Sequence, residues 1–303
     1  MFKINPIKKA AKDYLKIEST DHQSHAHICL SDGGSLQELV LHEKKIIQQS
    51  ATDNYATSYA SAILFPFANR IDNASYSFQE KNYTLNVNLK EENNAIHGLV
   101  YNKEFTLKSK EINQQQASVT LVYSEENKTQ GFPFTYTIEL TYILTEDALS
   151  LSVCITNNDV VPFPFSLGWH PYFYSSNLYN SSLCIDSNSR ILLSTSEMIP
   201  TITKDTSMQK ELQIKDRFFD DCYLLNTDKM MFKTPDYHIQ INSFLEKNYV
   251  QIFTPSERSS IAIEPITAPP NSFNHKLGLR VLNSDENYTA IWKVSLKSTS
   301  HEN

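Results

Sequence analysis

The feature that most constrains the fold of this chain is a strict alternation of apolar and polar residues between Phe134 and Ile155. Every second residue from Tyr136 to Leu144 is apolar or aromatic, and most residues between them are Thr or Glu. After an acidic turn the alternation resumes and continues to the end of the segment. Such a period of two places one face of a strand in the core and the other toward solvent. The segment therefore predicts a hairpin of two half-buried strands.

Weaker alternation of the same kind marks four more segments, namely 118–123, 249–254, 260–264 and 288–296. Residues 8–14 and the loop near Asp186 are the short stretches that could form helical turns. Many short strands without helix-period segments between them are typical of antiparallel sandwiches. No internal repeat or linker-like tract divides the 303 residues. We expect an all-β fold, a large antiparallel β-sandwich, built as a single domain over residues 1–303.

Charge and composition narrow the classes of partner. The formal net charge is −7, so the chain lacks the basic footprint of a protein that binds nucleic acid or an anionic membrane. No signal peptide and no run of about 18 apolar residues is evident, which predicts a cytoplasmic protein without a membrane span. The scattered cysteines predict free thiols rather than a disulfide framework: Cys29, Cys154, Cys184 and Cys222.

An unusual concentration of aromatic residues surrounds His170, which directly precedes a proline. A residue before proline is restricted to extended conformations, so the backbone of His170 is held. Trp169, Tyr172 and Phe173 are flat side chains of the kind that line small-molecule clefts. A held imidazole in such a cleft can act as a general acid or base near neutral pH. The alternative is a core turn in which the histidine only satisfies a neighbouring carbonyl group.

Three further stretches place polar groups in apolar surroundings. Arg70 follows Asn69 within an apolar run, so it is either paired with a buried carboxylate or directed into a cleft. His97 precedes a glycine, a pattern that is more often structural than catalytic. Glu264 ends an apolar strand before a proline, where partial burial would raise its pKa toward the range of a general base. A buried salt bridge between Glu264 and Arg70 is the structural alternative.

The order of these motifs resembles the aldose 1-epimerase (galactose mutarotase) family. The resemblance rests on four motifs that span most of the chain: Asn69-Arg70-Ile71, His97-Gly98, His170-Pro171-Tyr172-Phe173 and Glu264-Pro265. It implies the large antiparallel super-sandwich of that family. It also implies interconversion of the α and β anomers of free aldohexoses of the glucose or galactose type, with no cofactor and no metal. A monomer or a homodimer is compatible with it.

The resemblance also implies roles for individual residues. Glu264 matches the general base that takes the proton of the anomeric hydroxyl, and His170 matches the general acid that protonates the ring oxygen. Arg70 and His97 match residues that hydrogen-bond the sugar, with Asn69 and Tyr172 from the same motifs beside them. An aspartate that binds sugar hydroxyls is matched by Asp220, which fits the spacing better than Asp221.

Two alternatives share the scaffold. A hexose-6-phosphate 1-epimerase would need cationic groups around the phosphate, yet the residues after His97-Gly98 are Leu99-Val-Tyr101 rather than an arginine. A non-catalytic sugar-binding module is possible on any such fold. The presence of both Glu264 and His170 favours an enzyme over that module.

A metal-dependent enzyme is suggested by the spacing of His22, His25 and His27. The His-x-His pair has the spacing of metal ligands on a strand. No glutamate follows within the next few residues, and the segment is polar. A solvated strand is therefore the preferred interpretation.

Overall fold

The alternating segment forms the predicted hairpin in a computed structural model that describes residues 1–48, 54–193, 200–208 and 211–298. Strand β13 (Tyr136–Leu144) pairs antiparallel with β14 (Ala148–Asn157) along its whole length. The alternate residues of β13 from Tyr136 to Leu144 are buried, whereas the residues between them are only half-buried. The period of two in the sequence is therefore the period of burial in the fold.

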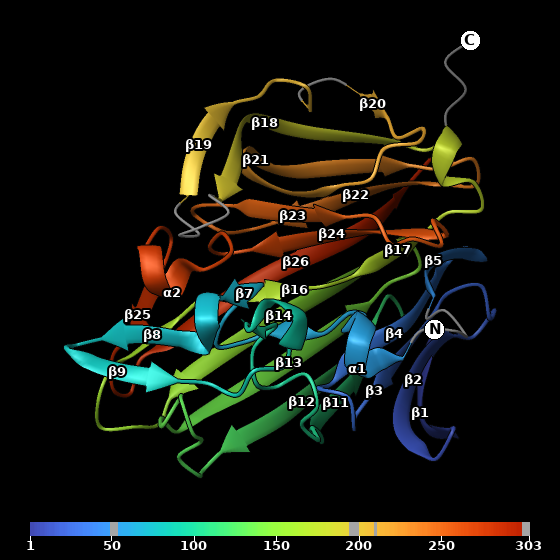
Figure 1. Cartoon of the computed structure of the whole chain (residues 1–303). Helices are drawn as coiled ribbons and strands as arrows, with labels where there is room; N and C mark the ends of the chain where they lie inside the picture. Colours follow the sequence, from blue (N-terminus) through green and yellow to red (C-terminus); the bar gives the residue numbers. More distant parts are fainter. Residues whose placement is uncertain (49–53, 194–199, 209–210, 299–303) are drawn as a thin grey trace.

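The hairpin belongs to a 20-stranded antiparallel sheet that curves until it nearly closes into a barrel-like super-sandwich. In Figure 1 the green strands β11–β14 cross the lower half of the molecule and the yellow to red strands β18–β24 form its upper half. The blue N-terminal strands lie at one side. The expected all-β sandwich is confirmed, as are the strands expected at 118–123, 249–254, 260–264 and 288–296.

The strands of the first half are β1 (Phe2–Lys9), β2 (Lys12–Ser19), β3 (His25–Cys29), β4 (Ser35–Leu41), β5 (Lys44–Gln48), β6 (Ile63–Leu64), β7 (Arg70–Ile71), β8 (Ser75–Phe78), β9 (Lys81–Thr84), β10 (Ala95–Ile96), β11 (Thr106–Ile112) and β12 (Ala117–Glu125). Those after the central hairpin are β15 (Phe163–Phe165), β16 (Gly168–Trp169), β17 (Tyr172–Tyr174), β18 (Ser182–Leu193), β19 (Pro200–Lys204), β20 (Leu212–Gln213), β21 (Asp220–Lys233), β22 (His238–Ser243), β23 (Tyr249–Phe253), β24 (Ser260–Ile266), β25 (Arg280–Leu282) and β26 (Asn287–Lys297).

Helical structure in the described residues is confined to single turns. These are the α-helices α1 (Tyr55–Ser58) and α2 (Ser272–His275) and the 3₁₀ turns Asp72–Ala74, Lys90–Glu92 and Leu178–Asn180. None of the described helices combines the length and apolar character needed to cross a bilayer.

Neither of the two stretches that could form helical turns is helical. Residues 8–14 contain the β1–β2 hairpin, in which Ala10 and Ala11 make the two-residue turn with φ angles of 47° and 65°. Two consecutive positive φ angles are the geometry of a tight hairpin turn, so the chain forms a β-hairpin here and not a helical turn. Asp186 lies inside β18, at a point where the register with β21 shifts between Ile185 and Ser187.

The core fills the space enclosed by the curved sheet. Trp169 and Trp292 are fully buried, and their rings stack with centroids 6.3 Å apart. Phe173 is fully buried in the same core. The expectation that Trp169 and Phe173 line a cleft is therefore wrong, because strand alternation turns them to the face opposite His170 and Tyr172.

Candidate active site

The pairing of β24 with two short strands sets His170 opposite Glu264. Gly168 of β16 pairs with Ile266, and Tyr172 of β17 pairs with Ala262, so the same antiparallel register places residue 170 across from residue 264. Residues directly opposite in an antiparallel pair share a face and have neighbouring Cβ atoms. Nε2 of His170 lies 3.4 Å from Oε1 of Glu264.

The backbone of His170 is fixed from its other side. Its N–H donates to the carbonyl oxygen of Ala62 (3.1 Å), and its own carbonyl accepts from the N–H of Ser61 (2.8 Å). Pro171 restricts the conformation of His170 further. The backbone of His170 is therefore held between two neighbouring segments, β24 on one side and residues 61–62 on the other.

Burial dominates the electrostatics of the pair. The exposed fractions are 4% for His170 and 2% for Glu264. Desolvation lowers the pKa of His170 to about 4, and it raises the pKa of Glu264 well above its ordinary value, with a further contribution from the charge of Asp220. Both shifts favour the uncharged forms. Among the described residues, Nδ1 of His170 and Oε2 of Glu264 are buried and have no hydrogen-bond partner.

His97 reaches the same site from a strained turn. Its backbone lies in the left-handed region (φ 63°), and its N–H donates to the carbonyl oxygen of Asn69 (2.9 Å), which is left-handed as well (φ 57°). Asn and His tolerate this region better than most residues. The ring of His97 stands edge-on to that of His170, with centroids 4.7 Å apart. Burial, followed by the charges of His170 and Arg70, lowers the pKa of His97 well below its ordinary value.

Arg70 points toward the cleft and is anchored at its rim. Nη1 of Arg70 donates to Oε2 of Glu92 (2.9 Å), and Nε donates to Oδ1 of Asn69 (3.3 Å). The side chain of Arg70 is 24% exposed. The alternative of a buried salt bridge between Arg70 and Glu264 is wrong, because Arg70 pairs with Glu92, whereas Glu264 lies against His170.

Gln251 lies beside Glu264 and is hydrogen-bonded to Asp220. It faces Glu264 across the β23–β24 pairing, and its Nε2 donates to Oδ1 of Asp220 (2.7 Å). Asp221 instead forms an ion pair with Arg190. Asp220 lines the same cavity as the catalytic candidates, whereas Asp221 lines the cavity beside it. The preference for Asp220 over Asp221 as the carboxylate that binds sugar hydroxyls stays a prediction.

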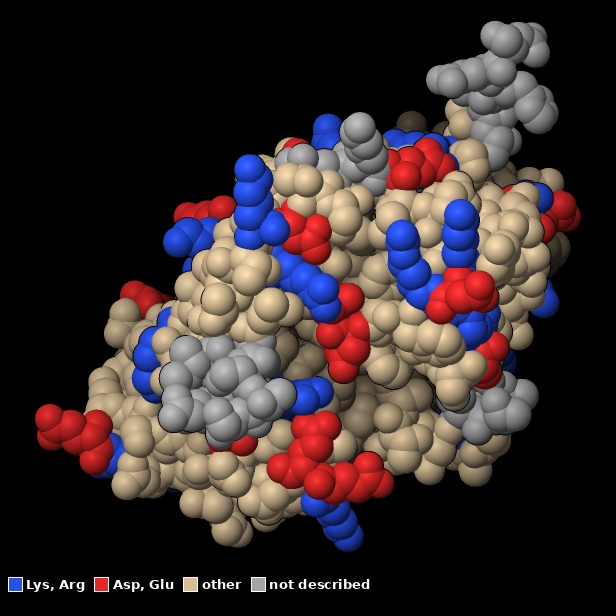
Figure 2. Space-filling model, turned by 45° about the horizontal axis from the view of Figure 1, so that its top comes forward, with Lys and Arg blue, Asp and Glu red and all other residues tan. Residues whose placement is uncertain are grey.

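All seven residues predicted for the site line one open cavity of about 560 Å³, namely Asn69, Arg70, His97, His170, Tyr172, Asp220 and Glu264. The ring of Tyr172 lies 5.0 Å from that of His170. Figure 2 shows a face that is hollowed near its middle, with acidic and basic side chains at the rim of the hollow. A cavity of this size with a few convergent polar groups suits a small polar ligand.

Sequence reasoning missed several lining residues, including Tyr59, Asn88, Glu92, Gln251 and Phe253. Alternation could have found Gln251 and Phe253, because both lie on one face of the predicted strand 249–254. The others come from short turns whose direction is set by tertiary contacts.

The sequence model of the family described as aldose 1-epimerase matches residues 16–295. A galactose mutarotase-like protein from Clostridium acetobutylicum has a similar structure, with a TM-score of 0.87, 20% identity and coverage of 98% of this chain and 99% of the other. The galactose 1-epimerase of Lactobacillus acidophilus gives a TM-score of 0.81 at 13% identity, with the same coverage. A protein of Escherichia coli K12 described as uncharacterized, YihR, is 23% identical over 288 residues, which cover 89% of each chain.

The chain thus belongs to the aldose 1-epimerase family and has the galactose mutarotase-like fold. Membership in a family of isomerases that act on sugars implies a cleft that binds a sugar.

Proposed function

We propose that this protein interconverts the α and β anomers of free aldohexoses of the glucose or galactose type. The observation that carries the proposal is the pair formed by His170 and Glu264, two buried proton-transfer groups 3.4 Å apart in an open cavity. Groups with strongly shifted pKa values in a cleft are typical of acid–base catalysis. The family match supports a sugar as the molecule on which they act.

In the proposed reaction Glu264 removes the proton of the anomeric hydroxyl. The oxygen then forms a carbonyl with C1, the bond from C1 to the ring oxygen breaks, and His170 protonates the ring oxygen as it leaves. Rotation about the C1–C2 bond presents the other face of the aldehyde. Closure reverses each step, so Glu264 returns its proton and His170 takes its own back.

The proton count of the pair suits this cycle. An ionised Glu264 beside a charged His170 holds one proton, and so does a protonated Glu264 beside a neutral imidazole. The first state opens the ring, and the second is the state that ring opening leaves behind. Burial favours the second state, as the directions of both pKa shifts indicate, so a proton passes from Glu264 to Nε2 of His170, 3.4 Å away, before the ring opens. The pair can therefore return to its starting state without exchanging a proton with solvent.

The remaining cleft residues have positioning roles in this proposal. Arg70, held by Glu92, offers guanidinium N–H groups to sugar oxygens, and Asp220 offers a carboxylate to hydroxyl groups. Burial keeps His97 uncharged, so it can both donate and accept a hydrogen bond. Arg70 is the only Lys or Arg among the described residues that line this cavity, and it is already paired. That environment favours a free sugar over a sugar phosphate.

Polarimetry of freshly dissolved α-glucose and α-galactose tests the proposal. The wild-type protein should accelerate the change in rotation, and Glu264→Gln should reduce kcat by about 100-fold or more with the fold intact. Circular dichroism of the variant provides the control for folding. Near wild-type turnover in the Gln variant removes Glu264 from the role of base.

A substrate panel separates the alternatives. Faster turnover of the 6-phosphates than of the free sugars would identify a hexose-6-phosphate epimerase. Saturable sugar binding without any acceleration would identify a non-catalytic binding module.

A further inference from the structure

A second cluster of polar side chains lies on the N-terminal strands, and it shares no lining residue with the sugar cleft. It consists of His25 and His27 of β3 and Glu38 of β4. Nε2 of His25 lies 2.6 Å from Oε1 of Glu38, and Nδ1 of His27 lies 3.0 Å from Oε2. Each imidazole therefore faces a different oxygen of one carboxylate.

The fold explains how these groups meet. His25 and His27 are two residues apart on a strand, so both side chains emerge on one face, while Ala26 and Ile28 enter the core. His27 pairs with Glu38 in the β3–β4 register, beside a register shift between His27 and Ile28. The carboxylate that was not found in the sequence near His27 thus arrives from the next strand. His27 is only 6% exposed, so the expectation of a solvated strand is wrong at this position.

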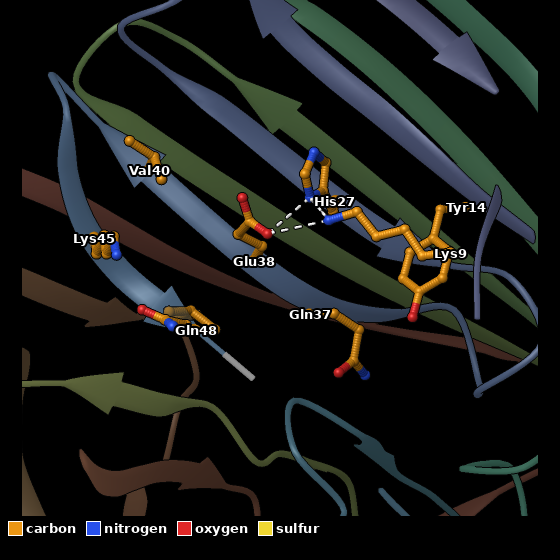
Figure 3. Close-up of a pocket in the computed structure, with 9 residues that line it drawn as sticks. Lys9, Tyr14, His27, Gln37, Glu38, Val40, Lys45 and Gln48 are labelled. Carbon is orange, nitrogen blue, oxygen red and sulfur yellow. Dashed lines mark hydrogen bonds and ion pairs between the residues drawn. The ribbon is translucent and has the colours of Figure 1, made fainter. Parts of the chain in front are cut away.

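A cation already lies against the cluster. Figure 3 shows the Lys9 side chain reaching His27 and Glu38, with Nζ 2.8 Å from Nδ1 of His27 and 3.2 Å from Oε2 of Glu38. Lys9 ends β1, and its side chain is 46% exposed. Such a long, half-exposed side chain can swing into solvent at little cost. The cluster thus attracts positive charge, and the group that supplies it is displaceable.

We propose that His25, His27 and Glu38 bind a divalent d-block cation such as Zn²⁺, which displaces the Lys9 ammonium. Two imidazoles and one carboxylate are a ligand set that zinc and other d-block ions accept. Their donor atoms all lie within 4.8 Å of one another, and the ligands of a tetrahedral zinc ion are separated by about 3.3 Å. Small side-chain rotations therefore suffice.

The surroundings leave room for the rest of the coordination shell. A cavity of about 300 Å³ opens beside His27 and Glu38, and it is lined in part by Tyr14 and Gln37. Three protein ligands and water in the open position would complete a four-coordinate site. Because His27 and Glu38 lie on different strands, a bound ion also links β3 to β4.

A purely structural ion-pair network is the competing explanation, and Lys9 distinguishes the two. If Lys9 only stabilises the sheet, removing its charge weakens the fold and creates no affinity for metal. If it competes with a metal ion, Lys9→Met removes the competitor and should tighten Zn²⁺ binding by about 10-fold. His25→Ala and Glu38→Gln should weaken binding by at least about 10-fold.

Isothermal titration of tag-free protein with Zn²⁺, and the visible spectrum after addition of Co²⁺, provide the measurements. His42→Asn is the matched control, because His42 is exposed, belongs to the same sheet region and has a positive φ angle that Asn tolerates. The expected result is one site per chain that the control variant leaves unchanged. Either of two results overturns the proposal: no zinc binding by the wild-type protein, or binding that His25→Ala and Glu38→Gln leave intact. Neither outcome bears on the sugar cleft, since mutarotation is measured separately.

Discussion

Replacing Glu264 by Gln should change how the stability of the protein depends on pH. Burial raises the pKa of Glu264 well above its ordinary value of 4.5, so the folded protein keeps a proton that the unfolded chain releases. A group of this kind contributes stability that is complete below its unfolded pKa and is lost as the pH rises toward its folded pKa. A difference of one proton changes the free energy of unfolding by about 1.4 kcal/mol per pH unit. As the pH rises above 4.5, the advantage of the wild type over Glu264→Gln in the free energy of unfolding should therefore fall.

The contribution of His170 to stability changes with pH in the opposite direction. Its pKa falls from 6.5 to about 4 on burial, so its stabilisation is complete above pH 6.5 and is lost as the pH falls through about 4. Between about pH 4.5 and 6.5 the contributions of His170 and Glu264 oppose each other in the wild type. In Glu264→Gln only the contribution of His170 remains, so stability should rise with pH across that window. His170→Gln should show the reverse slope.

Urea unfolding of the three proteins at half-unit steps of pH measures these slopes. Subtracting the free energy of unfolding of the variant from that of the wild type removes the contribution of every other titrating group that the substitution leaves undisturbed. A difference between wild type and Glu264→Gln that stays constant from pH 5 to pH 6.5 would refute the reasoning, because Glu264 would then titrate in the folded protein as it does in the unfolded chain.

Two further predictions concern the residues around the pair. Gly98→Ala and Gly278→Ala both place a Cβ at a positive φ angle, but the new atom lies 2.2 Å from the carbonyl oxygen of Phe65 in the first and no closer than 3.0 Å to any atom in the second. Urea unfolding should show that Gly278→Ala lowers the free energy of unfolding by about 1 kcal/mol and that Gly98→Ala lowers it by at least about 2 kcal/mol more. Equal decreases in the two variants would contradict the clash with Phe65. Arg70→Gln removes a charged donor from the cleft, so kcat/KM measured by polarimetry should fall by about 10- to 100-fold. Unchanged kinetics would show that Arg70 serves only its ion pair with Glu92.

The all-β fold was predictable because the pattern that identifies each strand lies within that strand. Alternation at a period of two identifies each half-buried strand without knowledge of its partner, and the segment from Tyr136 to Leu144 shows it clearly. The order of the strands in the sheet is different, because it depends on pairings between residues far apart in the sequence. Those pairings were supplied only by resemblance to a family.

The members of the candidate site were predictable, but most of their contacts were not. Arg70 required a partner on physical grounds, yet nothing in the sequence distinguished Glu92 from Glu264 for that role. The same limit applies to His25 and His27, whose carboxylate comes from another strand through a shifted register. Trp169 was placed on the wrong face, although alternation relative to His170 was sufficient to assign it to the core.

The precision of the site comes from strand register rather than from loops. A shift of one residue between β24 and its neighbours would turn Glu264 into the core and Ile263 into the cleft. Ile263 is fully buried in the main core, so such a shift would exchange a packed apolar side chain for a carboxylate. The apolar face of β24 thus fixes the position of the carboxylate on its other face. The same packing that stabilises the sheet holds Glu264 within reach of His170, and it keeps two ionisable groups buried with unpaired atoms that a bound sugar can satisfy.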